Sequence, residues 1–284
     1  MKLIADAGGT KIEWTLLDAA GNVAVRLTTR GYNAAQAEVQ TLARIIREDA
    51  PMLVERAQGV DEVYYYGAGC VGERVVGIKD VLTAVFNCGS SDCCRVESDM
   101  LGAARALCGR AEGVACILGT GSNSCRYDGE KIVDNVSPLG FILGDEGSGA
   151  VLGRRLIGMV MKGGFSDEIS ERFRRRFPEM TRDVIISRVY RGERPAAFLA
   201  SFVPFLAENI DVEEVEEFVV DEFCRFFRFN VKAYENAERL PINFIGSIAW
   251  HFSDQLRKAA ARSGCSVGRI EKAPMELLIA YHRD

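Results

Sequence analysis

The sequence contains a repeated pattern of three short strands, and this repeat limits the folds that the chain can adopt. The first copy reads "KLIADAG", "TKIEWTLLD" and "NVAVRLTTR". The second copy reads "GVACILGTG", "SNSCRYD" and "EKIVDNV", about 110 residues further along. Apolar runs separated by Gly, Asn and Asp are typical of antiparallel strands joined by tight turns. The repeat therefore predicts two related halves, each of which opens with a β-meander.

Helices and strands alternate after each meander, which predicts an α/β protein. Between the copies we expect a helix over 34–49, a buried strand "EVYYYGAG", a helix "ERVVGIKDVLTAVF", a strand "CRVES" and a helix "DMLGAARAL". After the second copy we expect helices from "GSGAVLGRRL" onward, including a long one over 212–240. A strand "PINFIGS", a helix over 248–264, a strand "VGRIEKA" and a helix "PMELLIAYH" close the chain.

The charge pattern excludes several classes of partner. The chain carries 35 basic and 40 acidic residues, a net charge of -5, with both signs mixed along the sequence. Because no basic run stands out, nucleic acid and anionic membranes are not expected partners. Asp6 interrupts the apolar stretch near the start, which excludes a secretory signal there, and no apolar run is long enough to cross a bilayer. We therefore expect a cytoplasmic protein.

The numbers and positions of the cysteines and histidines limit the kinds of metal site and catalytic site that the chain can form. Nine scattered cysteines, an odd number, favour a reducing compartment over a disulfide framework. Adjacent Cys93 and Cys94 lack the two-residue gap of a zinc knuckle, and neither His251 nor His282 has another ligand near it in sequence, so no structural zinc is expected. With only two histidines, both late in the chain, Ser-His-Asp and Cys-His nucleophiles are disfavoured. We expect the chemistry to use carboxylates.

The glycine-rich turns of the two meanders indicate phosphate binding. A dinucleotide fingerprint or a P-loop would open a helix, whereas a strand follows each turn here. Glycines let backbone N–H groups approach an anion, and Thr10 and Lys11 add a hydroxyl and an ammonium group. Asp6 is placed to hold a cation beside that anion. An ordinary hairpin explains one such turn equally well, but the second turn, "GTGSNS", repeats the same composition, and two turns can grip one triphosphate.

Three motifs carry a resemblance to a known superfamily: "DAGGTK" (Asp6 to Lys11), "LGTGSN" (Leu118 to Asn123) and "LGDEGSG" (Leu143 to Gly149). In them the chain resembles the actin-like ATPases and sugar kinases, and among these the N-acetylglucosamine kinase and BadF/BadG/BcrA/BcrD type ATPase family. The resemblance implies two ribonuclease H-like domains around a central cleft, the second with a large helical portion. We place the domains at 1–108 and 109–284, with the last helix, 274–284, free to pack back on the first.

The resemblance also implies ATP and Mg²⁺ as cofactors and assigns roles to residues. Asp99, which follows the strand "CRVES", matches the family's general base, which accepts the proton of a sugar hydroxyl as it attacks the γ-phosphate. The alternative role for Asp99 is a helix-start carboxylate that satisfies free N–H groups. Asp6 would hold the metal. The residues expected to contact ATP are Gly8, Gly9, Thr10, Lys11, Gly119, Thr120, Gly121, Gly246 and Ser247.

The implied sugar site comprises, besides Asp99, the residues Asn33, Gly69, Ser122, Asn123, Gly140 and Asp145. Asp145 would accept hydrogen bonds from sugar hydroxyls, whereas Glu146 can be a structural cap. Asn33 has a local alternative, because "NAAQ" fits a capping box with Asn33 as the N-cap residue. Gly69 fits an ordinary turn after a buried strand as well as a close approach of substrate.

Two segments depart from the family pattern. "SPLGF" stands where the family has a Gly-Gly-Trp-Gly stretch, and "PMELLIAY" stands where relatives carry a small-residue segment. Contacts to the sugar and to the edge of the nucleotide can differ at these places.

The function implied by the resemblance is ATP-dependent phosphorylation of an amino sugar, with N-acetylglucosamine first, then glucosamine or N-acetylmuramic acid. One alternative is an ATPase activator of a radical dehydratase, which in this family carries an iron–sulfur cluster bridging a dimer. The adjacent Cys93 and Cys94 are a poor pair for such a cluster. The other alternative is a non-catalytic sensor of ATP or sugar, against which Asp99 argues. The oligomeric state stays open, a homodimer included.

Overall fold

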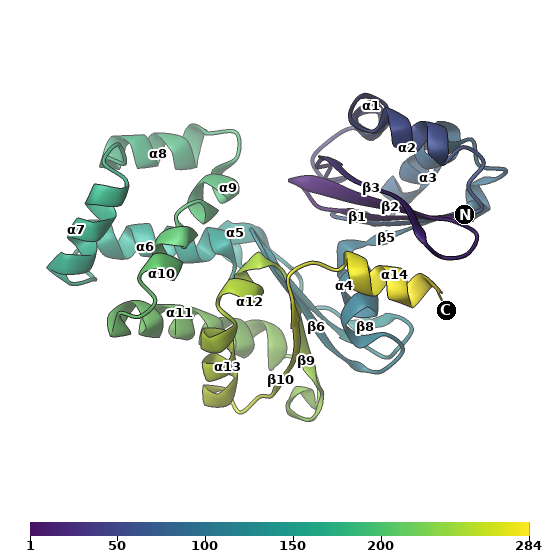
Figure 1. Cartoon of the computed structure of the whole chain (residues 1–284). Helices are drawn as coiled ribbons and strands as arrows, with labels where there is room; N and C mark the ends of the chain where they lie inside the picture. Colours follow the sequence, from purple (N-terminus) through teal and green to yellow (C-terminus); the bar gives the residue numbers. More distant parts are fainter. Residues whose placement is uncertain (284) are drawn as a thin grey trace. The chain divides into compact units, whose positions relative to one another are not determined.

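The computed structural model describes residues 1–283, and contacts divide the chain into two compact units (Figure 1). The first unit comprises Met1–Arg110 together with the chain from Pro274 onward, and the second comprises Ala111–Ala273. The last helix thus groups with the first unit. Asp284, the end of the expected helix 274–284, lies outside the described residues.

The first unit is built on a five-stranded sheet in the order β3-β2-β1-β4-β5. β1 pairs antiparallel with β2 and β2 with β3, as the predicted meander requires, whereas β4 is parallel to β1 and β5 is parallel to β4. The carboxyl ends of β1, β4 and β5 therefore share one edge of the sheet. The five strands are β1 (Lys2–Ala7), β2 (Lys11–Leu17), β3 (Val23–Arg30), β4 (Glu62–Gly67) and β5 (Cys94–Ser98).

The second unit repeats this topology. Its sheet has the order β10-β9-β6-β7-β8, with β6, β7 and β8 antiparallel and with β9 parallel to both β6 and β10. The strand order and directions match those of the first sheet, so the repeat found in the sequence is a repeat of topology, and the expected α/β class is confirmed. The strands are β6 (Gly113–Leu118), β7 (Ser122–Tyr127), β8 (Ile132–Asp134), β9 (Ile242–Ile245) and β10 (Val267–Glu271).

Helices cover both faces of the first sheet (Figure 1). Alternate residues of each strand point to opposite faces, so Leu3 and Ala5 pack with α1 and α3 while Ile4 packs with α14. The helical segments of this unit are α1 (Val39–Asp49), α2 (Pro51–Arg56), α3 (Arg74–Phe86), the 3₁₀ turn η1 (Ser91–Cys93), α4 (Asp99–Cys108) and α14 (Met275–Arg283).

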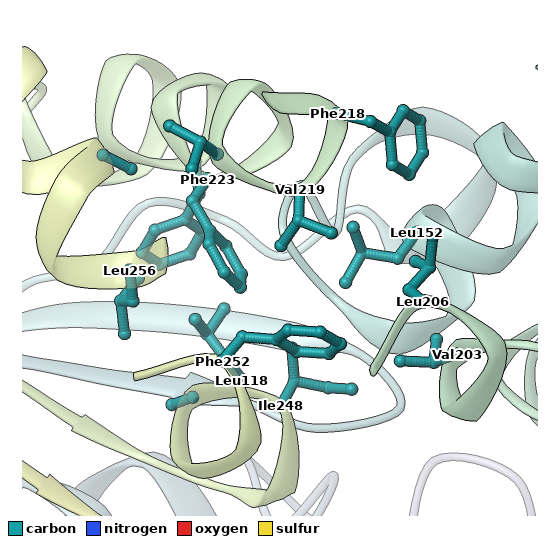
Figure 2. Packing of buried hydrophobic residues seen from close by; sticks show 14 of the residues in the cluster. Leu118, Leu152, Val203, Leu206, Phe218, Val219, Phe223, Ile248, Phe252 and Leu256 are labelled. Atoms are coloured by element: carbon teal, nitrogen blue, oxygen red, sulfur yellow. The ribbon is translucent and has the colours of Figure 1, made fainter. Parts of the chain in front are cut away.

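The second unit carries more helices, and most of its apolar side chains share one core. Figure 2 shows Phe223 of α11, Phe252 between α12 and α13, and Leu118 of β6 within that core. The helical segments are α5 (Gly140–Leu143), α6 (Gly149–Met161), α7 (Asp167–Arg176), α8 (Arg182–Arg191), α9 (Pro195–Ala200), α10 (Val203–Glu208), α11 (Glu213–Phe226), the π-helical turn η2 (Phe227–Val231), the 3₁₀ turn η3 (Ala237–Arg239), α12 (Ser247–His251) and α13 (Ser253–Arg262).

Three helices differ from the sequence-based expectation. The helix expected from residue 34 begins at Val39, because the segment before it is tied to the loop after β4: the Ala34 N–H donates to the Ala68 carbonyl. The expected helix over 212–240 is regular only to Phe226 and then widens into the π-helical turn. The helix expected over 248–264 breaks at Phe252, whose side chain is buried in the core.

The last helix is fastened to the first sheet through His282. Its imidazole stacks on the ring of Tyr64, with centroids 3.7 Å apart, and its Nε2 is hydrogen-bonded to the Tyr66 hydroxyl at 2.9 Å. Lys2 Nζ donates to the His282 carbonyl at 2.6 Å. Burial, followed by the charge of Arg105, lowers the pKa of His282 to about 3, so the imidazole is neutral in the folded protein.

Within residues 1–283, no helix combines the length and the apolar character that crossing a membrane requires.

Candidate functional site

In the first unit, the turn between β1 and β2 is held by main-chain hydrogen bonds. The Gly8 N–H donates to the Lys11 carbonyl at 3.0 Å, and the Tyr32 N–H donates to the Gly8 carbonyl at 3.1 Å. The Gly31 N–H donates to the Thr10 carbonyl at 3.1 Å, and a Cβ at residue 31 would lie 2.4 Å from the Thr10 carbonyl carbon. The "DAGGTK" turn is therefore supported by Gly31, a residue that the sequence motifs did not identify.

Asp6 lies at the end of β1 beside two other carboxylates. It pairs across the sheet with Glu13 of β2, and Asp99 lies near enough to act on it electrostatically. Burial, then the charges of Asp99 and Glu13, raise the pKa of Asp6 to about 7, while Lys11 opposes the shift. The negative charges of Asp99 and Glu13 thus act on Asp6, and carboxylate oxygens are the ligands that Mg²⁺ prefers. The residues around Asp6 therefore fit a divalent cation.

Asp99 is the first residue of α4, but it is not the cap of that helix. The N-cap is Ser98, whose Oγ accepts from the Leu101 N–H, while Asp99 Oδ1 accepts from the Met100 N–H at 2.9 Å. Ser98 is therefore the N-cap, and Asp99 also meets the alternative expectation in part, because its carboxylate satisfies a free N–H group at the helix start. Burial raises the pKa of Asp99, as suits a group that has to accept a proton.

The structure brings Asn33 and Gly69 together in the first unit. Asn33 Oδ1 accepts from the Ala35 N–H at 2.9 Å, and a Cβ at residue 69 would lie 2.7 Å from this same Oδ1. Gly69 also has a φ of +74°, which favours glycine. The capping box expected at Asn33 is wrong: the helix begins at Val39, and Asn33 closes a local turn against the loop that follows β4.

In the second unit, the turn between β6 and β7 is joined to the start of α6. The Gly119 N–H donates to the Gly121 carbonyl at 3.0 Å. The first N–H groups of α6 donate into the turn, from Gly149 to Gly119 at 2.8 Å and from Ala150 to Thr120 at 3.0 Å. These helix N–H groups hold the turn and are not available to a ligand.

Gly246 follows β9 and lies against the same turn. Its φ is +122°, and a Cβ there would lie 2.2 Å from the Leu118 carbonyl oxygen. Only glycine allows the β9 end and the β6 end to approach this closely. Ser247, which follows, opens α12.

A cavity of about 460 Å³ opens beside these glycines, entirely within the second unit. One end is formed by Gly119, Thr120 and Ser247. The walls are largely apolar and include Val203 of α10, Ile248 of α12 and Phe252, which follows α12. An apolar pocket with a few polar groups at one end suits a flat aromatic ligand that carries an anionic tail. The sequence motifs found the glycine end but missed the α10 wall, because α10 carries no recognisable signature. The full lining is Gly119, Thr120, Gly149, Ala200, Val203, Pro204, Ala207, Glu208, Ser247, Ile248, His251 and Phe252.

Asp145 is held in an unusual backbone conformation beside three other predicted site residues. Its φ is +54°, which is uncommon for a residue with a side chain and occurs often at functional sites. Its carboxylate accepts from the backbone N–H groups of Ser122 and Gly140, and a Cβ at Gly121 would lie 3.0 Å from its Oδ2. Burial raises the pKa of Asp145, which these two hydrogen bonds partly offset. Ser122 and Gly140 therefore position Asp145.

Neighbouring side chains complete the loop that carries Asp145. Glu146 Oε2 accepts from Asn230 Nδ2 of the π-helical turn at 3.0 Å, so Glu146 ties the loop to α11. Asn123 Oδ1 accepts from the Ser124 N–H at 2.9 Å and from Asn135 Nδ2 at 3.0 Å. Asn230 and Asn135 have no motif in the sequence, and only the folded chain shows them beside the predicted residues.

Comparison with known proteins identifies the family. The profile of the BadF/BadG/BcrA/BcrD ATPase family matches residues 5–220, which is more than half of the chain. The chain belongs to this ATPase family. The resemblance stated from "DAGGTK", "LGTGSN" and "LGDEGSG" is thereby confirmed. A search of curated protein sequences found no match to this BadF-family protein.

Solved structures share the fold of this BadF-family protein over its whole length. A protein from Porphyromonas gingivalis, assigned provisionally as an N-acetylglucosamine kinase, is 43% identical, with a TM-score of 0.93 over 99% of this chain and 98% of that one. A second provisional N-acetylglucosamine kinase, from Chromobacterium violaceum, has a TM-score of 0.75 at 15% identity, covering 99% and 98%. A ROK family glucokinase from Streptomyces griseus, in complex with glucose and AMPPNP, has a TM-score of 0.56 at 15% identity, covering 99% and 97%. The last two show the fold alone, the two-domain fold of actin-like sugar kinases.

Proposed function

We propose that this protein is an ATP-dependent sugar kinase whose substrate is an amino sugar, with N-acetylglucosamine first. The observation that carries the proposal is the buried position of the Asp99 carboxylate at the start of α4. Ser98 is the N-cap of α4, Asp99 accepts a hydrogen bond from the Met100 N–H, and burial raises the pKa of the Asp99 carboxylate, as suits a proton acceptor. The 43% identical provisional N-acetylglucosamine kinase supports the choice of sugar.

The proposed reaction is transfer of the γ-phosphoryl group to a sugar hydroxyl. Asp99 accepts the hydroxyl proton, the sugar oxygen forms a bond to the γ-phosphorus, and the bond from that phosphorus to the β,γ-bridging oxygen breaks, leaving ADP. Such transfers depend mainly on positioning and on charge stabilisation. The turns at Gly8 to Lys11 and Gly119 to Gly121 would hold the phosphates, with the Lys11 ammonium group beside them. Mg²⁺, held by Asp6, would neutralise phosphate charge when bound.

The nucleotide base and ribose would occupy the 460 Å³ cavity of the second unit. Its apolar walls suit a stacked purine, and Gly119 and Thr120 lie at the end where phosphates would leave the cavity. Ser247 lines this cavity, and Gly246, directly before it, lies at the close approach of β9 to β6. This assignment supports the expectation that these two residues serve the adenosine side.

The sugar would be bound by polar groups on two loops. Asn33 and Gly69 lie together in the first unit, and Asp145 lies with Ser122, Asn123 and Gly140 in the second. Asp145 would accept hydrogen bonds from sugar hydroxyls, since an ionised carboxylate offers only acceptors. We further propose that the protein works in the cytoplasm on this small molecule.

The test is ADP release by the purified protein with ATP and Mg²⁺, with no sugar and with N-acetylglucosamine, glucosamine, N-acetylmuramic acid or glucose. We expect sugar-dependent release that Asp99→Asn lowers by about 10²- to 10⁴-fold. Asp80→Asn, at an exposed position of α3, is the matched control and should keep wild-type turnover. Release without sugar would instead favour the dehydratase-activator type of ATPase. Sugar binding without release would favour a sensor. Either result contradicts the proposal.

A further inference from the structure

Three cysteines of the first unit, distant from the motifs described above, lie with their sulfur atoms together. The Sγ atoms of Cys88, Cys93 and Cys94 are all within 4.8 Å of one another. Cys94 Sγ is 3.9 Å from Cys88 Sγ and 3.7 Å from Cys93 Sγ. Cys88 follows α3, Cys93 ends the 3₁₀ turn η1, and Cys94 begins β5. The spacing C-x₄-C-C matches no common zinc motif, so only the fold reveals the third sulfur.

The local backbone builds this cluster. α3 ends at Asn87 in the left-handed conformation, with φ +49°, and the Cys88 N–H then donates back to the Thr83 carbonyl at 3.1 Å. This turn directs the chain so that Cys88 meets Cys94 of the edge strand β5. Thr83 Oγ1 donates to Cys94 Sγ at 3.6 Å. The three sulfurs are therefore brought together by two secondary-structure elements and the turn between them.

The separations match those between sulfur ligands of one metal ion. With metal–sulfur bonds of about 2.3 Å in tetrahedral geometry, two bound sulfurs lie about 3.8 Å apart. Uncharged thiols in simple contact have similar separations, so the distances alone do not indicate a metal site. Two further features of the cluster support one. The cluster lies at the C-terminal end of α3, where the helix dipole favours a cation. Cys88 and Cys94 are buried, whereas Cys93 is partly exposed, which leaves a route for an ion to enter.

We propose that Cys88, Cys93 and Cys94 form a three-thiolate site for a soft d¹⁰ metal ion, with Zn²⁺ the first candidate. On binding, the three S–H groups release their protons to solvent and three metal–sulfur bonds form, with no change of oxidation state. Water completes a tetrahedral set on the side of Cys93. The site would join the end of α3 to β5, the strand whose other end is Ser98 and leads directly to Asp99. It would thus stabilise the first unit.

The test uses the full chain, kept reduced by a phosphine, with Cd²⁺ as the probe. Thiolate ligands give Cd²⁺ a charge-transfer band in the ultraviolet, so a titration reports both stoichiometry and affinity. We expect one Cd²⁺ per chain. Cys93→Ser should lower the affinity by at least about 10-fold, since it removes one ligand. Cys108→Ser, a partly exposed cysteine of the same unit, is the control and should bind as the wild type does.

Thermal melting supplies an independent measurement. Zn²⁺ should raise the melting temperature of the wild type and of Cys108→Ser but not that of Cys93→Ser. Cys88→Ser serves as a second variant, and the melting temperatures without metal show whether each variant folds. The proposal would be overturned if no saturable Cd²⁺ band appeared. It would also be overturned if Cys93→Ser and Cys108→Ser lost Cd²⁺ affinity to the same extent. None of these measurements depends on the proposed kinase activity.

Discussion

Asn230 Nδ2 donates a hydrogen bond of 3.0 Å to Glu146 Oε2. Asn230 lies in the π-helical turn that ends α11, a kind of turn that is frequent at functional sites. The Ser124 hydroxyl of β7 donates to the Asn230 carbonyl at 3.0 Å. The loop "LGDEGSG" is therefore braced by α11 and β7, although it carries the strained Asp145 backbone.

Loss of this brace should affect the sugar more than the nucleotide. We expect Asn230→Ala to lower kcat/KM for the sugar by about 10- to 100-fold, because Asp145 is next to Glu146 and would be misplaced. The KM for ATP should stay near its wild-type value. Asn209→Ala is the matched control: Asn209 is also buried and hydrogen-bonded, to Arg172 and to the Phe205 carbonyl. Equal sugar kinetics in the two variants would contradict a positioning role for Asn230.

Gly31 should tolerate no side chain. A Cβ there would lie 2.4 Å from the Thr10 carbonyl carbon and 2.5 Å from the Gly9 carbonyl carbon, and these backbone atoms cannot move aside as a flexible side chain can. We expect Gly31→Ala to lower the free energy of unfolding by about 1–3 kcal/mol, the usual cost of overpacking, and to weaken ATP binding through the displaced turn. Gly89→Ala, where nothing lies within 4 Å of the added Cβ, is the control. Urea unfolding of both variants checks this, and similar midpoints would contradict it.

The cavity of the second unit can be filled by mutation to test whether it holds the nucleotide. Ala207 is an exposed residue of α10 that lines this cavity. We expect Ala207→Trp to raise the KM for ATP at least about 10-fold, since the indole would occupy space needed by the base. Sugar affinity, measured without nucleotide, should not change. Ala261→Trp, on the exposed side of α13, should leave the KM for ATP as it is. An unchanged KM in Ala207→Trp would place the base elsewhere.

Stability should fall in mild acid because of His282. Its pKa is lowered from 6.5 to about 3, by burial first and then by nearby cations, among them Arg105 and Lys2. Between these values the unfolded chain binds a proton that the folded chain does not, so unfolding becomes more favourable as the pH falls, by up to about 1.4 kcal/mol per pH unit. The effect is absent above the ordinary pKa of 6.5.

The measurement is the melting temperature at pH 7.5 and at pH 5.0, in wild type and in His282→Gln. The melting temperature of His282→Gln should fall less between pH 7.5 and pH 5.0 than that of the wild type, because residue 282 then no longer titrates. His251→Gln, at an exposed position of α12, is the control, and its melting temperature should fall as much as that of the wild type. A loss in His282→Gln equal to that of the wild type would show that other groups cause the acid sensitivity.

Local sequence patterns were sufficient to predict much of the fold of this protein. Alternating apolar runs and glycine turns predicted both meanders, and their recurrence predicted the repeated topology that the two sheets share. These features depend on residues close in sequence, which is why periodicity and turn chemistry reveal them. The family was likewise readable from three short motifs.

Contacts between distant segments decided the rest. Asn33 resembled a helix cap, but the bond from Ala34 to Ala68 holds its loop against the chain after β4 and moves the start of α1 to Val39. The α10 wall of the cavity, the support of Glu146 by Asn230 and the third sulfur at Cys88 also have no local signature. The strands, the turns and the family could be predicted from the amino-acid sequence, because their signals are local. The contacts between distant side chains were visible only in the folded chain, because packing brings together residues whose spacing in sequence carries no pattern.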